Sequence, residues 1–230
     1  MIFCKKLNSG EFMRKELKDY ILKEIKPKYK TFDKGHDVSH FNFVTKNCVE
    51  YGKALIQKGE NVDLEIAYTV GAFHDIGIMF GRENHAKSSA QVVRRDEVLK
   101  KFFSEEIVNL IAEAVEDHSS HLEYEPRSIY GKIVADADRN NTVYLTFSRP
   151  IKYGLKNERD CKTKKEHIDR VYEFVQKKFG RNGYVKYWLD IDATKKEQQA
   201  TWALLDDEKL CKTYISGLFD EITKGKFKDK

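Results

Sequence analysis

Residues 63–77 read DLEIAYTVGAFHDIG, and this stretch decides the fold class. Between Ile66 and Phe73 the side chains are apolar nearly all the way round a helical wheel, which predicts a helix buried on every side. Asp63 is suited to cap the start of that helix, and Gly77 marks its end. The stretch therefore predicts the centre of a helical bundle.

The composition favours the same fold class. The chain has 230 residues, of which 40% are hydrophobic and 34% are charged, with only 3 prolines. Plentiful Lys, Glu, Leu and Ala without β-branched alternation favour a mostly helical protein, and the length is ample for a hydrophobic core. We therefore expect an all-α fold. Further helices are expected at residues 11–25, 37–55, 84–99, 105–118, 129–144, 163–179 and 193–222.

Charge and cysteine usage exclude several classes of protein. A net charge of +5 is only mildly basic and no nucleic-acid motif accompanies it, so nucleic acid is not an expected partner. No run of about 18 apolar residues occurs, and the first residues lack the features of a signal peptide, so no membrane partner is expected. The cysteines form no CxxC pair, which argues against a disulfide framework or a cysteine zinc site and favours the reducing cytoplasm.

The central helix ends in His74-Asp75, two side chains that could bind a metal. An imidazole and a carboxylate at the end of an apolar helix are costly to desolvate, and a divalent metal would offset that cost. Taken alone, the dipeptide is better explained by a helix that merely ends in water.

Other histidines and acids strengthen the metal hypothesis. At about 100° per residue, His118 falls near the centre of an apolar stripe, and His40 sits at the border of another. Asp138 lies roughly 80° from the middle of the apolar stripe of its helix, whereas Asp136 lies about 120° away, on the solvent side. Asp138 is therefore the preferred ligand, with Asp136 as the fallback. Mixed imidazole and carboxylate ligation suits Mn, Fe, Co, Ni or Zn.

Four strings in this order resemble the HD superfamily of metal-dependent phosphohydrolases, over about residues 30–145. They are HDVSH (36–40), AFHDIG (72–77), EDHSSH (116–121) and KIVADADR (132–139). The resemblance implies a helical HD-domain bundle with a helical C-terminal extension. It implies that a first metal is held by His40, His74, Asp75 and Asp138. Extra ligands of two-metal members would correspond to His85, His118 and His121.

The chain also departs from part of the superfamily. Its HDIG string continues as Ile78-Met79-Phe80, without the Lys of cyclic-dinucleotide phosphodiesterases, and no GYP string follows. This speaks against a cyclic-dinucleotide substrate. The resemblance divides the chain into an N-terminal helix (1–29), an HD core (30–150) and a helical extension packed on the same domain (151–230).

The implied reaction is hydrolysis of a phosphate monoester or diester of a nucleotide-like small molecule, through a water activated by a divalent metal (Mn, Fe, Co, Ni, Zn or Mg). Asp75 would bind metal and accept a proton, and His118 would protonate the leaving oxygen or bind a second metal. Arg139 is the favoured phosphate clamp, because guanidinium matches phosphate bidentately. Lys132 and Arg149 are weaker candidates for the same role.

Two other functions stay open from the sequence. The domain could be a non-catalytic nucleotide-binding regulatory module with a structural metal. It could also resemble the few di-iron oxygenases of the HD fold, which need a fuller ligand set. His167, beyond the resemblance, is expected to be a surface residue.

Overall fold

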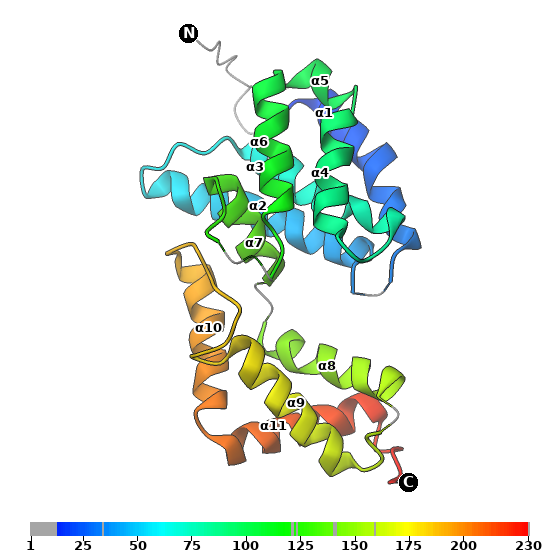
Figure 1. Ribbon diagram of the computed structural model, residues 1–230. Coiled ribbons are helices and arrows are strands. Elements are labelled where there is room, and N and C mark those ends of the chain that lie inside the picture. The colour runs from blue at the N-terminus through cyan, green and yellow to red at the C-terminus, as the bar shows by residue number, and fades with distance from the viewer. Residues whose placement is uncertain are drawn as a thin grey trace. The chain divides into compact units, whose positions relative to one another are not determined.

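The computed structural model describes residues 13–33, 35–120, 122, 124–139, 142–158 and 160–229 (Figure 1). Within these ranges all regular secondary structure is helical, which confirms the expected all-α class. The chain forms two compact units. Unit 1 extends to Asp138 and regains the segment Tyr187–Ile191, and unit 2 contains Arg139–Lys186 and the residues from Asp192 onward. The bounds 1–29, 30–150 and 151–230 stay a prediction.

Unit 1 is built from short helices around a central one (Figure 1). They are α1 (Lys15–Tyr20), η1 (Ile21–Ile25), η2 (Lys26–Thr31), α2 (Val38–Gln57), α3 (Leu64–Phe73), η3 (Ile76–Phe80), α4 (His85–Arg95), α5 (Leu99–Phe102), α6 (Glu105–Glu116) and α7 (Ile129–Arg139).

The apolar helix predicted from the sequence is α3, and it is buried as expected. Residues from Ile66 to Phe73 are inaccessible or nearly so, apart from a half-buried Tyr68. The carboxylate of Asp63 accepts hydrogen bonds from the N–H groups of Glu65 and Ile66 at 2.8 and 3.4 Å, which caps the first turn. Helices α2 and α6 both pack against α3. The end of α3 therefore lies inside unit 1.

The helix predicted over residues 11–25, before Pro27, changes its winding along its length. α1 passes into the wider turn η1 and then into the tight 3₁₀ turn η2, which has Pro27 in its first turn. η2 buries the side chain of Tyr29 completely.

The single helix predicted over 129–144 is wrong. α7 ends at Arg139, and a separate helix, α8, begins at Val143 with Thr142 as its N-cap. The Thr142 hydroxyl accepts a hydrogen bond from the N–H of Leu145 at 3.3 Å. A capping residue thus starts a new helix where apolar periodicity alone continued the old one.

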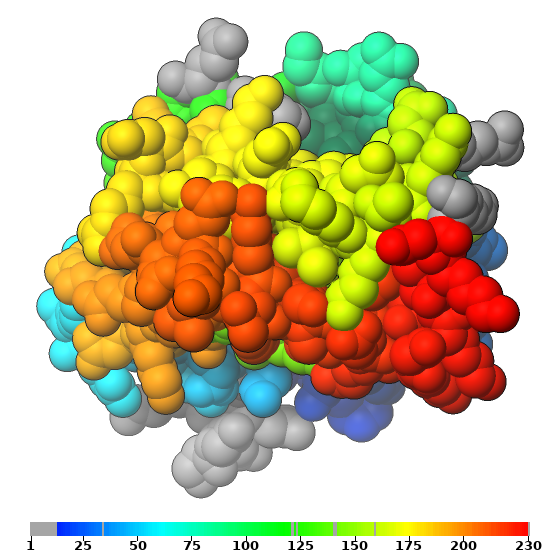
Figure 2. Space-filling model, turned by 90° about the horizontal axis from the view of Figure 1, so that it is seen from below, coloured from blue at the N-terminus to red at the C-terminus, as the bar shows by residue number. Residues whose placement is uncertain are grey.

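Unit 2 has a hydrophobic core of its own, formed by α8 (Val143–Asn157), α9 (Lys164–Phe179), α10 (Asp192–Leu205) and α11 (Glu208–Thr223). The helix predicted over 193–222 is two helices, because the side chain of Asp207 caps a new start at Glu208. The predicted capping box of Thr163 and Glu166 opens α9. Side chains of α11, coloured orange to red, form much of the face of unit 2 seen in Figure 2.

The prediction that His167 lies on the surface is wrong. Its exposed fraction is 2%, and its ring lies 5.6 and 5.5 Å from the rings of Phe219 and Phe227. Phe219 and Phe227 therefore cover a face of α9 that the local sequence pattern assigns to solvent.

No helix formed by the described residues combines the length and apolar character needed to cross a bilayer.

Candidate metal centre

The end of α3 orients the imidazole of His74. Nδ1 of His74 lies 2.8 Å from the carbonyl oxygen of Gly71. Because a carbonyl can only accept, Nδ1 carries a proton and Nε2 is the ring nitrogen that faces the other side chains of the site. His74 is fully buried, so this orientation of its ring is fixed inside the unit.

Two more histidines are held in the same way. Nδ1 of His85 lies 2.9 Å from the carbonyl oxygen of Arg82, and Nδ1 of His118 lies 2.6 Å from that of Val115. In both residues Nε2 is therefore the ring nitrogen that faces the other side chains of the site. Main-chain orientation of Nδ1 with Nε2 left free is the arrangement that metal-binding histidines use.

The first group of converging ligand atoms is formed by His40, His74 and Asp75. Nε2 of His40 lies 3.1 Å from Nε2 of His74, and Oδ2 of Asp75 lies 3.4 and 3.0 Å from these two nitrogens. Oδ1 of Asp138 lies 3.1 Å from Nε2 of His40. The four residues that the sequence singled out are therefore neighbours in unit 1.

A second group is formed by Asp75, His85 and His118. The two imidazole Nε2 atoms are 3.1 Å apart, and Oδ1 of Asp75 lies 3.4 Å from His85 and 3.5 Å from His118. His121, the third histidine predicted for this position, lies outside the described residues. Each oxygen of the Asp75 carboxylate thus faces one of the two groups.

Two buried polar atoms show that these contacts are not satisfied by protein hydrogen bonds. Among the described residues, none donates to Oδ2 of Asp75 or pairs with Nδ1 of His40. Where nitrogen lone pairs and carboxylate oxygens face one another, a proton or a cation must lie between them, because the bare groups repel. A cation between them removes the repulsion, so the donor set fits a divalent metal.

The electrostatics are consistent with a site built for positive charge. Burial alone would favour the neutral acid of Asp75, but the neighbouring imidazoles, His74 foremost, hold the pKa of this carboxyl well below its usual range. Burial also opposes a charge on His40, yet hydrogen bonding of its charged form to Asp138 and Asp75 outweighs burial and raises the pKa of His40 to about 9. A proton on His40 therefore occupies the position that a metal would take.

The preference for Asp138 over Asp136 agrees with the contacts, but the reason given for it is wrong. Asp136 is fully buried, and its carboxylate accepts hydrogen bonds from the N–H groups of Trp188 and Leu189 at 2.8–3.0 Å. The face of α7 that was expected to meet water is covered by Tyr187–Ile191, which returns to unit 1 from later in the chain.

The predicted phosphate-binding residues have other partners. Lys132 forms an ion pair of 2.5 Å with Glu125. Arg139 is buried, and its Nη1 donates to the carbonyl oxygen of Lys186 at 2.7 Å. Arg149 is half-buried on α8 of unit 2. Their role toward a substrate stays a prediction.

The sequence did not single out Arg82, which lies beside the site. Its carbonyl orients His85, and its Nη1 lies 3.0 Å from Oδ2 of Asp33. Oδ1 of Asp33 lies 3.0 Å from Nδ1 of His36, whose ring packs 5.7 Å from that of His40. The Arg82 side chain is 66% exposed. Pairing across two loops leaves no local pattern in the sequence.

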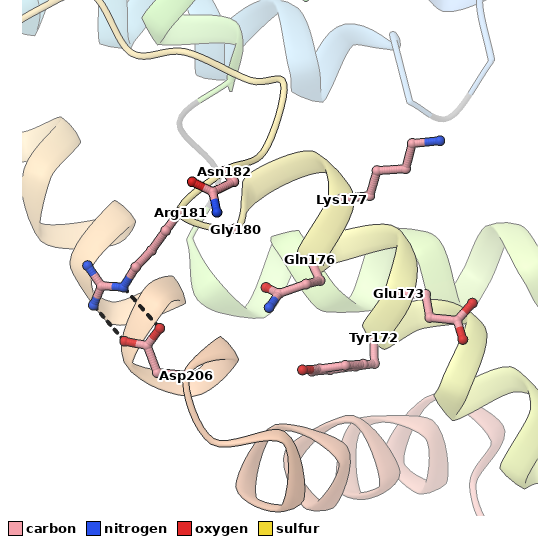
Figure 3. Close-up of a pocket in the computed structure, with 8 residues that line it drawn as sticks. All are labelled: Tyr172, Glu173, Gln176, Lys177, Gly180, Arg181, Asn182 and Asp206. Atoms are coloured by element: carbon pink, nitrogen blue, oxygen red, sulfur yellow. Dashed lines mark hydrogen bonds and ion pairs between the residues drawn. The ribbon is translucent and has the colours of Figure 1, made fainter.

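A pocket of about 590 Å³ belongs to unit 2 (Figure 3). Tyr172, Gln176 and Lys177 of α9 line it, and an Arg181–Asp206 ion pair crosses one end. None of its lining residues is a candidate metal ligand.

Comparison with known families gives one match. Residues 38–141 match the family model of the HD domain, a range that includes every candidate ligand named above. No curated protein and no solved structure matches the chain. The HD superfamily is one of metal-dependent phosphohydrolases, and the His/Asp groups of this chain could hold a metal. Residues 38–141 of the chain therefore form an HD domain.

Proposed function

We propose that this chain hydrolyses a phosphate ester of a small, nucleotide-like molecule, with one or two divalent metals held by the two His/Asp groups. One observation carries the proposal: the two oxygens of Asp75 face two separate pairs of imidazole Nε2 atoms. A structural metal site is normally closed by its protein ligands, whereas two adjoining, incomplete sets leave positions for water and substrate.

His40, His74, Asp75 and Asp138 would hold the first metal, and Asp75, His85 and His118 the second. A divalent metal there would supply an activated water at neutral pH and neutralise charge on a phosphoryl oxygen. The low pKa of Asp75 keeps its carboxylate ionised, so each of its oxygens would be available as a ligand to the group that it faces.

His118 is oriented as a metal ligand. Its Nδ1 contacts the carbonyl oxygen of Val115, and its Nε2 faces Nε2 of His85 and Oδ1 of Asp75. A ring held by the main chain in this way turns its other nitrogen toward the position of a metal. We therefore assign His118 to the second ligand set.

Arg82 is the residue that we assign to the substrate phosphate. Its guanidinium is exposed and uses only Nη1 for Asp33 among the contacts described above. The same Asp33 contacts His36, whose ring packs against that of His40, and the main-chain carbonyl of Arg82 contacts His85. Guanidinium groups bind phosphate in a bidentate manner, and a dianionic phosphate competes well with a single exposed carboxylate.

The test of the proposed function is metal content together with phosphate release. Purified protein should contain about one or two transition-metal ions per chain. A panel of nucleoside monophosphates, cyclic nucleotides and generic mono- and diesters, with Mn²⁺, Co²⁺, Ni²⁺, Zn²⁺, Fe²⁺ or Mg²⁺ added, should identify an ester that is cleaved.

His74→Ala should lose both metal and activity, whereas His167→Gln, which changes a buried histidine of unit 2, should keep both. Full activity in Asp75→Ala would contradict the mechanism.

The role of Arg82 has a closely matched control. Arg82→Gln should raise KM for the cleaved ester about tenfold or more, since a charge-assisted phosphate contact is lost. Arg181 forms an ion pair with Asp206 of nearly equal exposure, 61% and 48% against 66% and 47% for Arg82 and Asp33. Arg181→Gln should leave KM unchanged. Equal KM values in Arg82→Gln and the unaltered protein would remove Arg82 from the substrate site.

A second candidate function is a di-iron oxygenase of the HD fold, which the second ligand group favours. Such an enzyme needs two complete ligand sets, and Asp75, His85 and His118 extend the first set in that direction. Element analysis and a Mössbauer spectrum of iron-loaded protein distinguish the two candidates. A coupled pair of irons without phosphate release on any ester would favour the oxygenase.

A further inference from the structure

Tyr29 is a buried residue that precedes the matched HD range and was not singled out by the sequence. It belongs to η2, and its exposed fraction is 0%. Its hydroxyl donates to the carbonyl oxygen of Ala72 at 2.9 Å and accepts from the N–H of Asp75 at 3.3 Å. One side chain thus contacts the main chain on both sides of His74.

These two hydrogen bonds replace the ones that α3 gives up at its end. In an uninterrupted α-helix the N–H of Asp75 would donate to the carbonyl of Gly71, and the carbonyl of Ala72 would accept from Ile76. Here the carbonyl of Gly71 accepts instead from Nδ1 of His74. The N–H of Asp75 and the carbonyl of Ala72 need other partners, because buried main-chain groups are costly to leave unpaired. The Tyr29 hydroxyl is the partner of both.

The ring of Tyr29 is held firmly enough to fix the hydroxyl. It packs edge-on against Phe41 at 5.0 Å and against Phe32 at 5.1 Å. Phe41 follows His40 in α2, so the same ring contacts the helix that supplies the first ligand. Tyr29 therefore joins the helix end that carries His74 and Asp75 to the helix that carries His40.

We propose that Tyr29 is a positioning residue of the metal centre: it holds the main chain at Asp75 so that each carboxylate oxygen faces one ligand group. This inference rests on the proposed metal-dependent function. Loss of the hydroxyl would allow the chain at Asp75 to turn, and small changes at a shared carboxylate alter both metal positions together.

The test is a metal titration of Tyr29→Phe, which removes the hydroxyl and keeps the ring. Binding of Co²⁺ to the metal-free protein is followed by calorimetry and by the visible absorption spectrum, which reports ligand geometry without activity. We expect an affinity at least about tenfold weaker and a changed Co²⁺ spectrum, as is usual when a group that orients a ligand is removed.

Tyr130 gives a matched control at the other end of the same helix. Its hydroxyl accepts from the N–H of Asp63 at 2.9 Å, and its exposed fraction is 8%. Tyr130→Phe should lower the thermal midpoint by a similar amount to Tyr29→Phe, yet leave the Co²⁺ affinity and spectrum unchanged. Unchanged Co²⁺ binding in Tyr29→Phe, or equal weakening in both variants, would overturn the positioning role.

Two further outcomes are separable. If Tyr29→Phe does not fold, replacement of Tyr29 by 4-aminophenylalanine keeps a donor for Ala72 but offers a weaker acceptor to Asp75. Weakened Co²⁺ binding would then support the proposal, and normal binding would refute it. If the unaltered protein binds no Co²⁺, the proposed function itself fails and the inference falls with it. Binding that is lost in His74→Ala but kept in Tyr29→Phe refutes only the inference.

Discussion

Asp136 and Asp138 stand two positions apart on α7 and have different surroundings. Asp136 is fully buried and accepts main-chain hydrogen bonds from Trp188 and Leu189. The Asp138 side chain is 27% exposed and lies 3.1 Å from Nε2 of His40. The first carboxylate accepts hydrogen bonds from the main chain of a distant segment, and the second borders the candidate metal centre.

These surroundings predict opposite effects of the same substitution. Asp136→Asn should lower the free energy of unfolding by about 1–3 kcal/mol, because an amide group would face main-chain donors in a buried position, and metal content should be unchanged. Asp138→Asn should weaken metal binding about tenfold or more, with a smaller loss of stability. Urea unfolding and metal titration of both variants check this. A stable Asp136→Asn protein without metal would reverse the assignment of the two carboxylates.

Local patterns predicted which of the candidate ligands lie close together better than they predicted which side chains are exposed. His40, His74, Asp75 and Asp138 were found because each lies near the apolar face of its helix or at its buried end. The expected exposure of Asp136 and His167 was wrong for one reason. In both cases a segment distant in the chain, Tyr187–Ile191 or the region of Phe227, covers the face that helical periodicity assigns to water.

Among the elements, the contact of η3 with α4 depends on Gly77. A Cβ at this position would meet main-chain atoms of His85 and Ser89 closer than real Cβ atoms approach. The N–H of Gly77 also donates to the hydroxyl of Ser89 at 2.7 Å. The glycine of the HDIG string therefore lets the chain after Asp75 lie directly against the helix that begins with His85.

Gly77→Ala should therefore separate η3 from α4. We expect a loss of about 1–3 kcal/mol in the free energy of unfolding, as for overpacked cores, and weaker binding at the second metal position before the first. Thermal unfolding and stepwise metal titration measure the two effects.

Gly217→Ala is the control: nothing lies within 4 Å of a Cβ there, and the site is an exposed turn of α11. It should stabilise by about 0.5–1 kcal/mol and leave metal binding unchanged. Equal metal binding in both variants would show that Gly77 does not position His85.

The existence of the helices could be predicted from the sequence more reliably than their ends. Apolar periodicity identified α2, α3, α6 and α9 and the capping residues of three of them. It extended α7 into the first residues of α8 and merged α10 with α11, because apolar spacing continues across Thr142 and Asp207 while the side chains of these residues cap new helices. No periodic pattern in the sequence predicts the winding change from η1 to η2, which places Tyr29.

At the scale of the whole molecule, the chain passes between its two units three times. It leaves unit 1 after Asp138, returns for Tyr187–Ile191 and continues in unit 2 from Asp192. Leu189 and Ile191 belong to the core of unit 1, where they are 6% and 1% exposed. A five-residue segment without regular structure gives no local signal that it completes a distant core, so this connection could not be derived from the sequence.

The two tryptophans of the chain make the units distinguishable by fluorescence. Trp188 lies in the segment that unit 1 regains, and Trp202 lies in α10 of unit 2. Nε1 of Trp202 donates to the carbonyl oxygen of Phe179 at 3.0 Å, which couples this indole to the end of α9. A Trp188→Phe protein therefore reports the unfolding of unit 2 alone.

This reporter tests a pH dependence that originates at His167. Burial, and then the charge of Arg170, lowers the pKa of His167 below its ordinary value of 6.5. The folded unit thus excludes a proton that the unfolded chain binds below pH 6.5, so stability is complete above that pH and falls as the pH decreases. The decrease due to this group is at most about 1.4 kcal/mol per pH unit.

Urea unfolding of Trp188→Phe between about pH 7.5 and about pH 5.5 should show this decrease in stability. The same series with His167→Gln added retains the carboxylate contributions and should have a shallower slope. Identical slopes in the two series would mean that His167 is protonated as readily in the folded unit as in the unfolded chain.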